Sequence, residues 1–287
     1  MRAKRLLVRG AAMAALAIAA CTVVLAQQKP KPGGTALPPV TVTAPSRGDP
    51  VEKSYRKMVR GMDLFERLHA MAPSAPLRFK LLPRKHDTDM DHIALEVIGD
   101  TVDIPIAVAP DRTFTLPRDR KAWDENAVVS PNRRKQSMTW RTEIRTPGLP
   151  PDTRRLGDLR LECEVGIEAE LVSNNHSVIG AIANLFTDAG YCKHKDARYL
   201  FFADRALFGV TLTAGNRSEM LPIDKLYAMA IDDPDLKGDL PFCDCEVLVD
   251  RTYYLPLGDT SWPDDTLVRF DYMDDGNGPP TRGASLR

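Results

Sequence analysis

Apolar residues early in the chain recur at helical spacing. Within residues 50–72 they return at steps of three and four, which places them on one face of an amphipathic helix. Asp49, Pro50 and Glu52 have the arrangement of a capping box, and Pro73 ends the pattern. The sequence therefore predicts a helix over residues 50–72. Its apolar face comprises Val51, Tyr55, Met58, Met62, Phe65 and Leu68.

The opposite face of this predicted helix is basic, and it allows two interpretations. The helix could lie on an anionic membrane or on a partner. Alternatively, it packs on the following domain and leaves its basic residues in solvent. The basic residues are Lys53, Arg56, Lys57, Arg60 and Arg67.

Beyond Pro76 the spacing of apolar residues falls to two, which predicts half-buried strands. The clearest case is the segment 159–171, where apolar residues alternate with glutamates, as in an antiparallel sheet with one face in solvent. Residues 174–190 return to helical spacing and end at a glycine, which predicts a short connecting helix. Further strands are expected at residues 77–81, 93–97, 138–144, 199–201 and 208–212.

One segment of the chain recurs. Asp111-Arg112-Thr113-Phe114-Thr115-Leu116-Pro117 matches Asp250-Arg251-Thr252-Tyr253-Tyr254-Leu255-Pro256, and we call the displacement from position 111 to position 250 the repeat shift. The same shift aligns Trp123 with Trp262. This indicates one structural unit used twice, although two unrelated hairpins with similar turns would give the same match. We interpret Asp111 and Asp250 as turn residues and expect both tryptophans at equivalent buried positions.

These patterns predict a mainly β (α+β) fold with two tandem antiparallel β-sandwich-like modules, an N-terminal amphipathic helix and a short connecting helix. The Pro-rich composition that follows residue 26 predicts an extended linker. The predicted segments are a linker at 27–49, the helix at 50–72, a first β-module at 77–172, the connecting helix at 173–196, a second β-module at 197–273 and a disordered tail at 274–287.

The first 26 residues have the composition of a secretion signal, a basic start followed by a short apolar run. Val24 and Ala26 stand at the small-residue positions of a signal-peptidase site, which predicts a periplasmic or secreted protein. Ile18-Ala19-Ala20-Cys21 also resembles a lipobox, so an outer-membrane lipoprotein with a lipid anchor at Cys21 is the alternative.

The balance of charge changes once this leader is removed. The whole chain has 39 basic and 39 acidic residues, and the leader contains four basic residues and no acidic ones, which leaves 35 against 39. A slightly acidic chain without clustered Lys and Arg lacks the electrostatic signature of a nucleic-acid partner.

Four cysteines follow the leader: Cys163, Cys192, Cys243 and Cys245. An even number in an oxidising compartment predicts two disulfides, with reduced thiols or a zinc site as alternatives. Residues i and i+2 of a strand are about 6.5–7 Å apart, at the limit for a disulfide. We therefore expect Cys163 and Cys192 each to pair with one member of the Cys243-x-Cys245 pair.

Two clusters carry groups that could hold a metal or act as acids. The first joins two imidazoles and three carboxylates, donors that suit a divalent ion if the loop curls. In an extended chain the imidazoles and carboxylates point to opposite sides, which favours a solvated loop between strands. The second is the glutamate face, a cation-binding or paired-carboxylate site or simply a solvated face. The residues are His86, Asp87, Asp89, Asp91 and His92 in the first and Glu162, Glu164, Glu168 and Glu170 in the second.

The sequence contains no recognisable catalytic, phosphate-binding or dinucleotide-binding motif, and it indicates no cofactor. The interpretation that follows is a non-enzymatic binding or structural component of the cell envelope, with an unknown partner or ligand. The alternative is an envelope hydrolase or divalent-metal-binding protein that uses residues 86–92 or 162–170.

The leader gives a direct prediction about processing. The mature protein should begin at Gln27, because Val24 and Ala26 form the cleavage site and the residues after Cys21 stay apolar. Intact mass spectrometry of the exported protein checks this. A diacylglyceryl adduct on Cys21 in the membrane fraction would contradict it.

Overall fold

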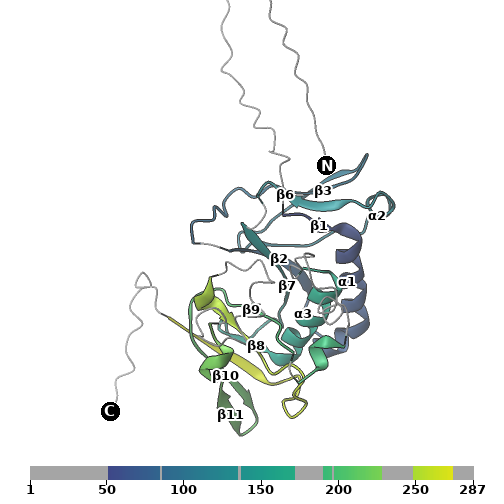
Figure 1. Ribbon diagram of the computed structural model, residues 1–287. Helices are drawn as coiled ribbons and strands as arrows, with labels where there is room; N and C mark the ends of the chain where they lie inside the picture. Colours follow the sequence, from purple (N-terminus) through teal and green to yellow (C-terminus); the bar gives the residue numbers. More distant parts are fainter. Residues whose placement is uncertain are drawn as a thin grey trace, which may run out of the picture. The chain divides into compact units, whose positions relative to one another are not determined.

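The computed structural model describes residues 51–84, 86–134, 137–171, 190–195, 197–227 and 248–273. Within these residues the chain consists mainly of strands in four antiparallel sheets, with few helices (Figure 1). The mainly β fold class is therefore confirmed. The predicted signal peptide, linker, connecting helix and tail lie outside the described residues, apart from residues 190–195 at the end of the range given for the connecting helix.

The first half of the chain forms two of the sheets. One has the strand order β1-β6-β3-β4, and the other places β2 between β5 and β7. The strands are β1 (Lys53–Ser54), β2 (Leu77–Pro83), β3 (Leu95–Ile98), β4 (Asp103–Ile106), β5 (Thr113–Phe114), β6 (Val128–Pro131) and β7 (Met138–Ile144). The helices are α1 (Tyr55–Leu68), α2 (Arg120–Asp124) and a 3-10 turn at His69–Met71.

The second half forms the other two sheets. One has the order β11-β10-β13-β8, and the other pairs β12 with β9. The strands are β8 (Thr153–Arg155), β9 (Phe201–Phe202), β10 (Leu207–Ala214), β11 (Arg217–Met220), β12 (Thr252–Tyr253) and β13 (Leu267–Tyr272). The helix is α3 (Leu156–Glu168), and the 3-10 turns are Tyr191–Lys193, Ile223–Lys225 and Val249–Arg251.

Helix α1 begins later than the capping-box pattern predicts. Its N-cap is Ser54, whose side chain accepts a hydrogen bond from the Lys57 amide at 3.5 Å. Lys53 and Ser54 pair with β6, so their backbone is extended and the helix starts at Tyr55. The predicted start after Asp49 is therefore wrong, because strand pairing satisfies the backbone just before the helix.

The segment 159–171 is the main error of the sequence analysis, since it contains most of helix α3 and not a strand. Every residue of α3 except Arg160 and Glu168 is buried, including Glu162 and Glu164. A helix that is buried on all sides has no polar stripe, so its apolar spacing does not reveal the helical period. The alternation of apolar and acidic residues therefore suggested a strand.

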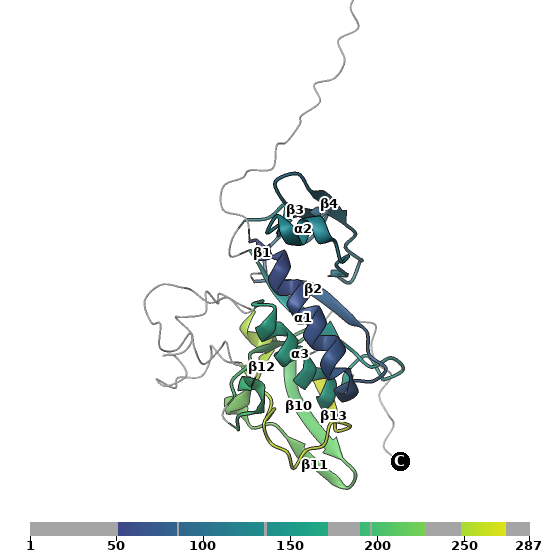
Figure 2. The same ribbon diagram turned by 90° about the vertical axis from the view of Figure 1, so that its right-hand side faces the viewer.

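Helix α1 packs closely along α3, and the two helices lie side by side in Figures 1 and 2. Gly61 allows the contact, because a Cβ atom there would lie 2.8 Å from the Cβ of Ala169. The basic face of α1 meets the end of α3, where Lys57 pairs with Glu170 and Arg60 with Glu168. These contacts favour the packed interpretation of the basic face.

Two large apolar clusters form the core, one in each half. The first contains Phe79, Phe114 and Trp140, and the second contains Phe201, Tyr253 and Trp262. The expectation of equivalent burial for the two repeat tryptophans is wrong for one of them. Trp262 is buried, but Trp123 is only partly buried, because it lies on the short surface helix α2 beneath the Arg56 guanidinium.

The described cysteines form a disulfide between Cys163 and Cys192, with their Cα atoms 6.0 Å apart. The expected pairing of each with the Cys-x-Cys pair is therefore wrong. Cys163 lies on the buried helix α3 and not on a strand, and it faces the 3-10 turn that carries Cys192. Cys243 and Cys245 lie outside the described residues.

None of the helices in the described part of the chain combines the length and apolar character needed to cross a membrane.

The disulfide gives a stability prediction. Its two cysteines are 29 residues apart, and the chain-entropy estimate for a loop of that size is about 3–4 kcal/mol. Cys192→Ser should lower the free energy of unfolding by about that amount, measured by urea denaturation of oxidised protein. Peptide mapping without reduction should recover the Cys163–Cys192 peptide pair, and a map with either cysteine joined to the Cys243–Cys245 peptide would contradict the assignment.

Candidate functional site

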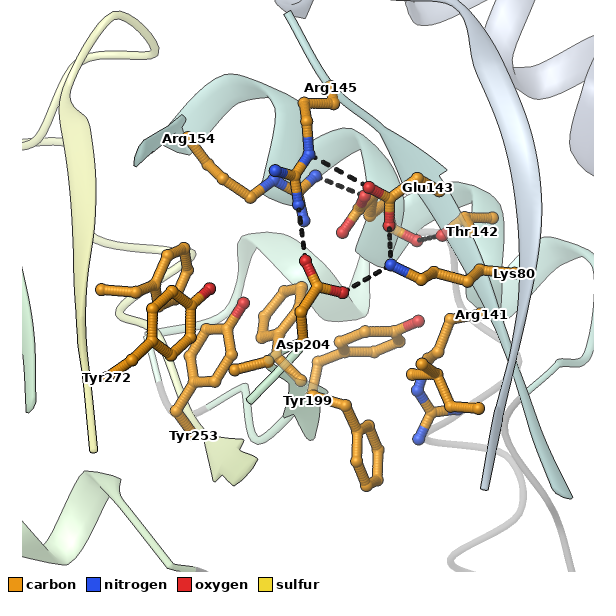
Figure 3. Close-up of a pocket in the computed structure, with 16 residues that line it drawn as sticks. Lys80, Arg141, Thr142, Glu143, Arg145, Arg154, Tyr199, Asp204, Tyr253 and Tyr272 are labelled. Atoms are coloured by element: carbon orange, nitrogen blue, oxygen red, sulfur yellow. Dashed lines mark hydrogen bonds and ion pairs between the residues drawn. The ribbon is translucent and has the colours of Figure 1, made fainter. Parts of the chain in front are cut away.

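A pocket lies where the second half of the chain meets the polar faces of β2 and β7 (Figure 3). Its walls come from β2, β7, β8, α3, β9, β12 and β13. They combine charged side chains with the rings of several tyrosines and phenylalanines. The cavity volume is about 20 Å³, close to the room that one water molecule needs.

Four charged side chains form a closed ring at the pocket. Lys80 of β2 contacts Asp204 at 2.5 Å and Glu143 of β7 at 3.9 Å. Arg145 contacts the same two carboxylates, Glu143 at 3.1 Å and Asp204 at 3.3 Å. Figure 3 shows Asp204 between the two cations. Positive and negative groups alternate around the ring, so each charge has two neighbours of opposite sign.

The ring joins the two halves of the chain, because Lys80, Glu143 and Arg145 belong to β2, β7 and the residue just after β7, whereas Asp204 follows β9. Burial raises the pKa of the Asp204 carboxyl, but the Lys80 ammonium and the Arg145 guanidinium lower it by more. The pKa of Asp204 is therefore below its usual value, and the carboxylate stays ionised between its two cations.

Deeper in the pocket, Arg154 and Glu162 form a buried ion pair. Their side chains are 7% and 5% exposed, and Nη2 of Arg154 lies 2.5 Å from Oε1 of Glu162. The same oxygen accepts a hydrogen bond from the Ile144 amide at 2.7 Å, and the Arg154 guanidinium also donates to the Ile144 carbonyl at 2.5 Å. The pair thus holds the last residue of β7 against β8 and α3.

Burial has the largest effect on the pKa of the glutamate in this pair. It raises the pKa of the Glu162 carboxyl to about 7, although the Arg154 guanidinium lowers it. A carboxyl with a pKa near neutrality resembles a general acid or base. Its oxygen Oε1, however, already accepts two hydrogen bonds from within the protein. The geometry therefore favours a structural role for Glu162.

Burial keeps the tyrosine hydroxyls of the pocket protonated and uncharged. Burial raises the pKa of Tyr199 to about 12 and that of Tyr272 to about 12, and it raises the pKa of Tyr253 well above its usual value. Arg141 lies with its guanidinium 4.4 Å from the centre of the Phe202 ring. These groups supply packing and cation–π contact, and the tyrosines do not supply a phenolate.

The structure does not bring the residues of the predicted metal loop together. His86, Asp87, Asp91 and His92 are exposed, and Asp89 pairs with Arg133 at 3.4 Å. Across the described ranges, no group of three or more His, Cys, Asp and Glu side chains is arranged to hold a metal ion. The solvated-loop interpretation of these residues fits this arrangement.

The predicted glutamate face does not exist as one surface, because three of its residues lie on helix α3 and Glu170 lies just after it, so none of them is on a strand. Glu162 and Glu164 are buried in α3, and Glu162 pairs with Arg154. Glu168 and Glu170 lie at the other end, where they pair with α1. The four carboxylates are therefore divided between two separate contacts, and the proposed carboxylate stripe is wrong.

The aspartates of the sequence match lie in turns. Oδ1 of Asp111 accepts hydrogen bonds from the amide of Thr113 at 3.1 Å and from its hydroxyl at 2.7 Å. Asp250 lies in the 3-10 turn Val249–Arg251. Their positions agree with the role of turn residues.

The residues that line the pocket were missed by sequence reasoning. The alternation along residues 77–81 and 138–144 predicts that Lys80 and Glu143 lie on solvated strand faces, and no sequence motif marks Arg154 or Asp204. The faces of β2 and β7 were assigned correctly as polar, but the second half of the chain covers them. The one local feature of the sequence that could have pointed to the pocket is the number of charged residues at alternate positions of β2 and β7.

No family model, no curated protein and no solved structure matches this chain.

The buried pair gives a prediction about stability. Arg154→Met should lower the free energy of unfolding by about 3–5 kcal/mol at pH 8, because it leaves the buried Glu162 carboxylate without a counter-charge. Urea denaturation followed by circular dichroism measures this.

Two further variants make the result specific. Arg154→Met combined with Glu162→Leu should cost less than Arg154→Met alone, because it removes both charges. Asp124→Asn, which breaks the exposed Arg120–Asp124 pair, should leave the unfolding midpoint unchanged. An equal effect of Arg154→Met and Asp124→Asn would show that the buried pair has no special role.

Proposed function

We propose that this chain is an exported, non-enzymatic component of the cell envelope, periplasmic or secreted, that acts by binding or as a structural part. We further propose that it consists of two copies of one β-rich module. The observation that carries the proposal is the pocket between the halves, where each charged group of the ring is paired and the cavity has room for about one water molecule. Such a pocket fits a contact that holds two modules together better than it fits a site that binds a substrate.

The strand orders support the two-copy proposal. The sheet β1-β6-β3-β4 in the first half has the same connectivity as β8-β13-β10-β11 in the second. In each, the short first strand leads directly into a helix, α1 after β1 and α3 after β8. In each, the next strand pairs with a short strand outside that sheet, β2 with β5 and β9 with β12.

The registers support it further, because one member of each equivalent pair is displaced by the repeat shift of the sequence match. Phe79 pairs with Phe114 and Phe201 with Tyr253, and the repeat shift carries position 114 onto position 253. The Tyr55 amide donates to the Ala127 carbonyl, and the Leu156 amide donates to the Thr266 carbonyl. The two acceptors, at positions 127 and 266, are again related by the repeat shift. A single shift across separate sheets favours one repeated module over two unrelated hairpins.

The leader and the disulfide support export. Residues 1–26 have the composition of a secretion signal, and disulfides such as Cys163–Cys192 persist mainly in oxidising compartments. A lipid anchor at Cys21 would place the same protein in the outer membrane. Both locations lie in the cell envelope, so the proposal holds for either.

The proposal predicts that the purified mature chain does not turn over a panel of ester, peptide, glycoside and phosphate substrates. The reason is that the pocket carboxylates are engaged with cations and the cavity has room for about one water molecule. Turnover that is abolished by Asp204→Asn or Glu143→Gln, but kept in Asp124→Asn, would overturn the proposal and make the pocket an active site. Fractionation of cells checks the location, and a cytoplasmic protein with residues 1–26 intact would overturn the export.

A further inference from the structure

The exposed apolar side chains gather on one sheet. Every large apolar residue that is exposed in the described residues lies on the sheet β11-β10-β13-β8 or directly beside it. Figures 1 and 2 show the β10–β11 hairpin at the lower end of the ribbon, with β11 at the edge. The residues are Phe208 (71% exposed), Met220 (62%), Ile223 (66%), Leu267 (40%) and Met273 (39%).

Within the described part of the chain, no strand pairs with the outer side of the edge strand β11. The Leu221 amide donates to the Val210 carbonyl at 2.8 Å, so Leu221 is bonded to β10. In an antiparallel pair such positions alternate with positions whose amide and carbonyl point away from the neighbour. The amides and carbonyls of Met220 and Ser218 therefore point outward, and both residues are exposed.

The equivalent edge in the first half is protected. Pro105 of β4 pairs with Glu96, as Met220 of β11 pairs with Thr211. The register shows that these positions are equivalent. Val97, which follows Glu96 in β3, pairs with Val129. Leu212, which follows Thr211 in β10, pairs with Val268, and the repeat shift relates positions 129 and 268. Pro105 has no amide hydrogen, and proline at such a position prevents further strand pairing. β11 has methionine there.

We propose that β11 pairs with β11 of a second copy of this chain, antiparallel, across a two-fold axis at Ser218. In this register Arg217 lies opposite Glu219 of the second copy, and Glu219 lies opposite its Arg217. Within one chain the two side chains already form an ion pair at 2.7 Å on the same side of the strand. Dimerisation would extend this pair to a network of four charges.

The neighbouring registers are disfavoured by the same residues. A two-fold axis at Glu219 would place Glu219 directly opposite itself, and like charges at facing positions destabilise a sheet. An axis at Met220 would bring Pro222, which lacks an amide hydrogen, opposite Ser218. The axis at Ser218 avoids both problems and uses the outward amides of Ser218 and Met220.

The dimer would join two four-stranded sheets into one of eight strands and make the exposed apolar residues part of a continuous face. The strand is short, so we expect reversible self-association that depends on protein concentration. This inference concerns assembly, and a monomeric protein would leave the proposed function of the single chain unchanged.

Sedimentation velocity of the full mature chain, from micromolar to hundreds of micromolar, tests the proposal. The parent protein should approach twice the monomer mass at high concentration. Met220→Pro, which copies Pro105 of β4, should weaken dimerisation by about tenfold or more, because proline removes the outward amide hydrogen at this edge position in both copies. Met220→Ala keeps the amide and should still dimerise.

A charge exchange tests the register separately. Arg217→Glu and Glu219→Arg, made singly, should each weaken dimerisation, and the double variant should restore it. Thermal melting of each variant controls for folding, because Arg217 also lies 3.6 Å from the centre of the Trp262 ring. A parent that stays monomeric, or a Met220→Pro variant that dimerises as tightly as Met220→Ala, would overturn the proposal.

Discussion

Arg154 and Glu162 meet where β7, β8 and α3 come together, and almost no water reaches either side chain. Removing two charges from water is costly unless they are paired and hydrogen-bonded, and here the Ile144 backbone completes the pairing. The position of α3 relative to β7 is therefore fixed. Because α3 also carries the close contact with α1 and the disulfide to Cys192, the arrangement of both halves depends on this pair.

Pairing of opposite charges also holds the structure together nearer the surface, in the ring of Lys80, Glu143, Arg145 and Asp204. The polar faces of β2 and β7 would normally face solvent, yet the second half of the chain covers them. That is tolerable because Lys80 of β2 and Arg145, just after β7, each meet the Asp204 carboxylate across the contact. Matched charges thus replace apolar packing where the halves meet, and they leave space for about one water molecule.

The two halves have the same strand order but different surfaces. Lys53 of β1 and Arg154 of β8 pair with Val129 and Val268, so a basic residue occupies the same position in both. Arg154 meets a buried glutamate, whereas burial lowers the pKa of Lys53 to about 8 and Lys53 donates to the Glu170 carbonyl. The outer edges differ as well, with Pro105 on β4 and Met220 on β11. If the two halves are copies of one module, as proposed, the same strand order carries a proline-protected edge on β4 and, on β11, an edge that no strand of the described residues pairs with.

The sequence alone predicted the strands, the helix and the turn whose positions follow from local residue patterns. The strands at 77–81 and 138–144, most of helix α1 and the turn at Asp111 follow from the spacing of apolar residues and from turn chemistry. Tertiary structure decided where burial overrides that spacing. Helix α3 is surrounded on all sides, so its glutamates suggested a solvated strand until Arg154 was seen to pair with one of them. The pocket has the same cause, because Lys80 and Asp204 are 124 residues apart and only the packing of the two halves brings their charges together.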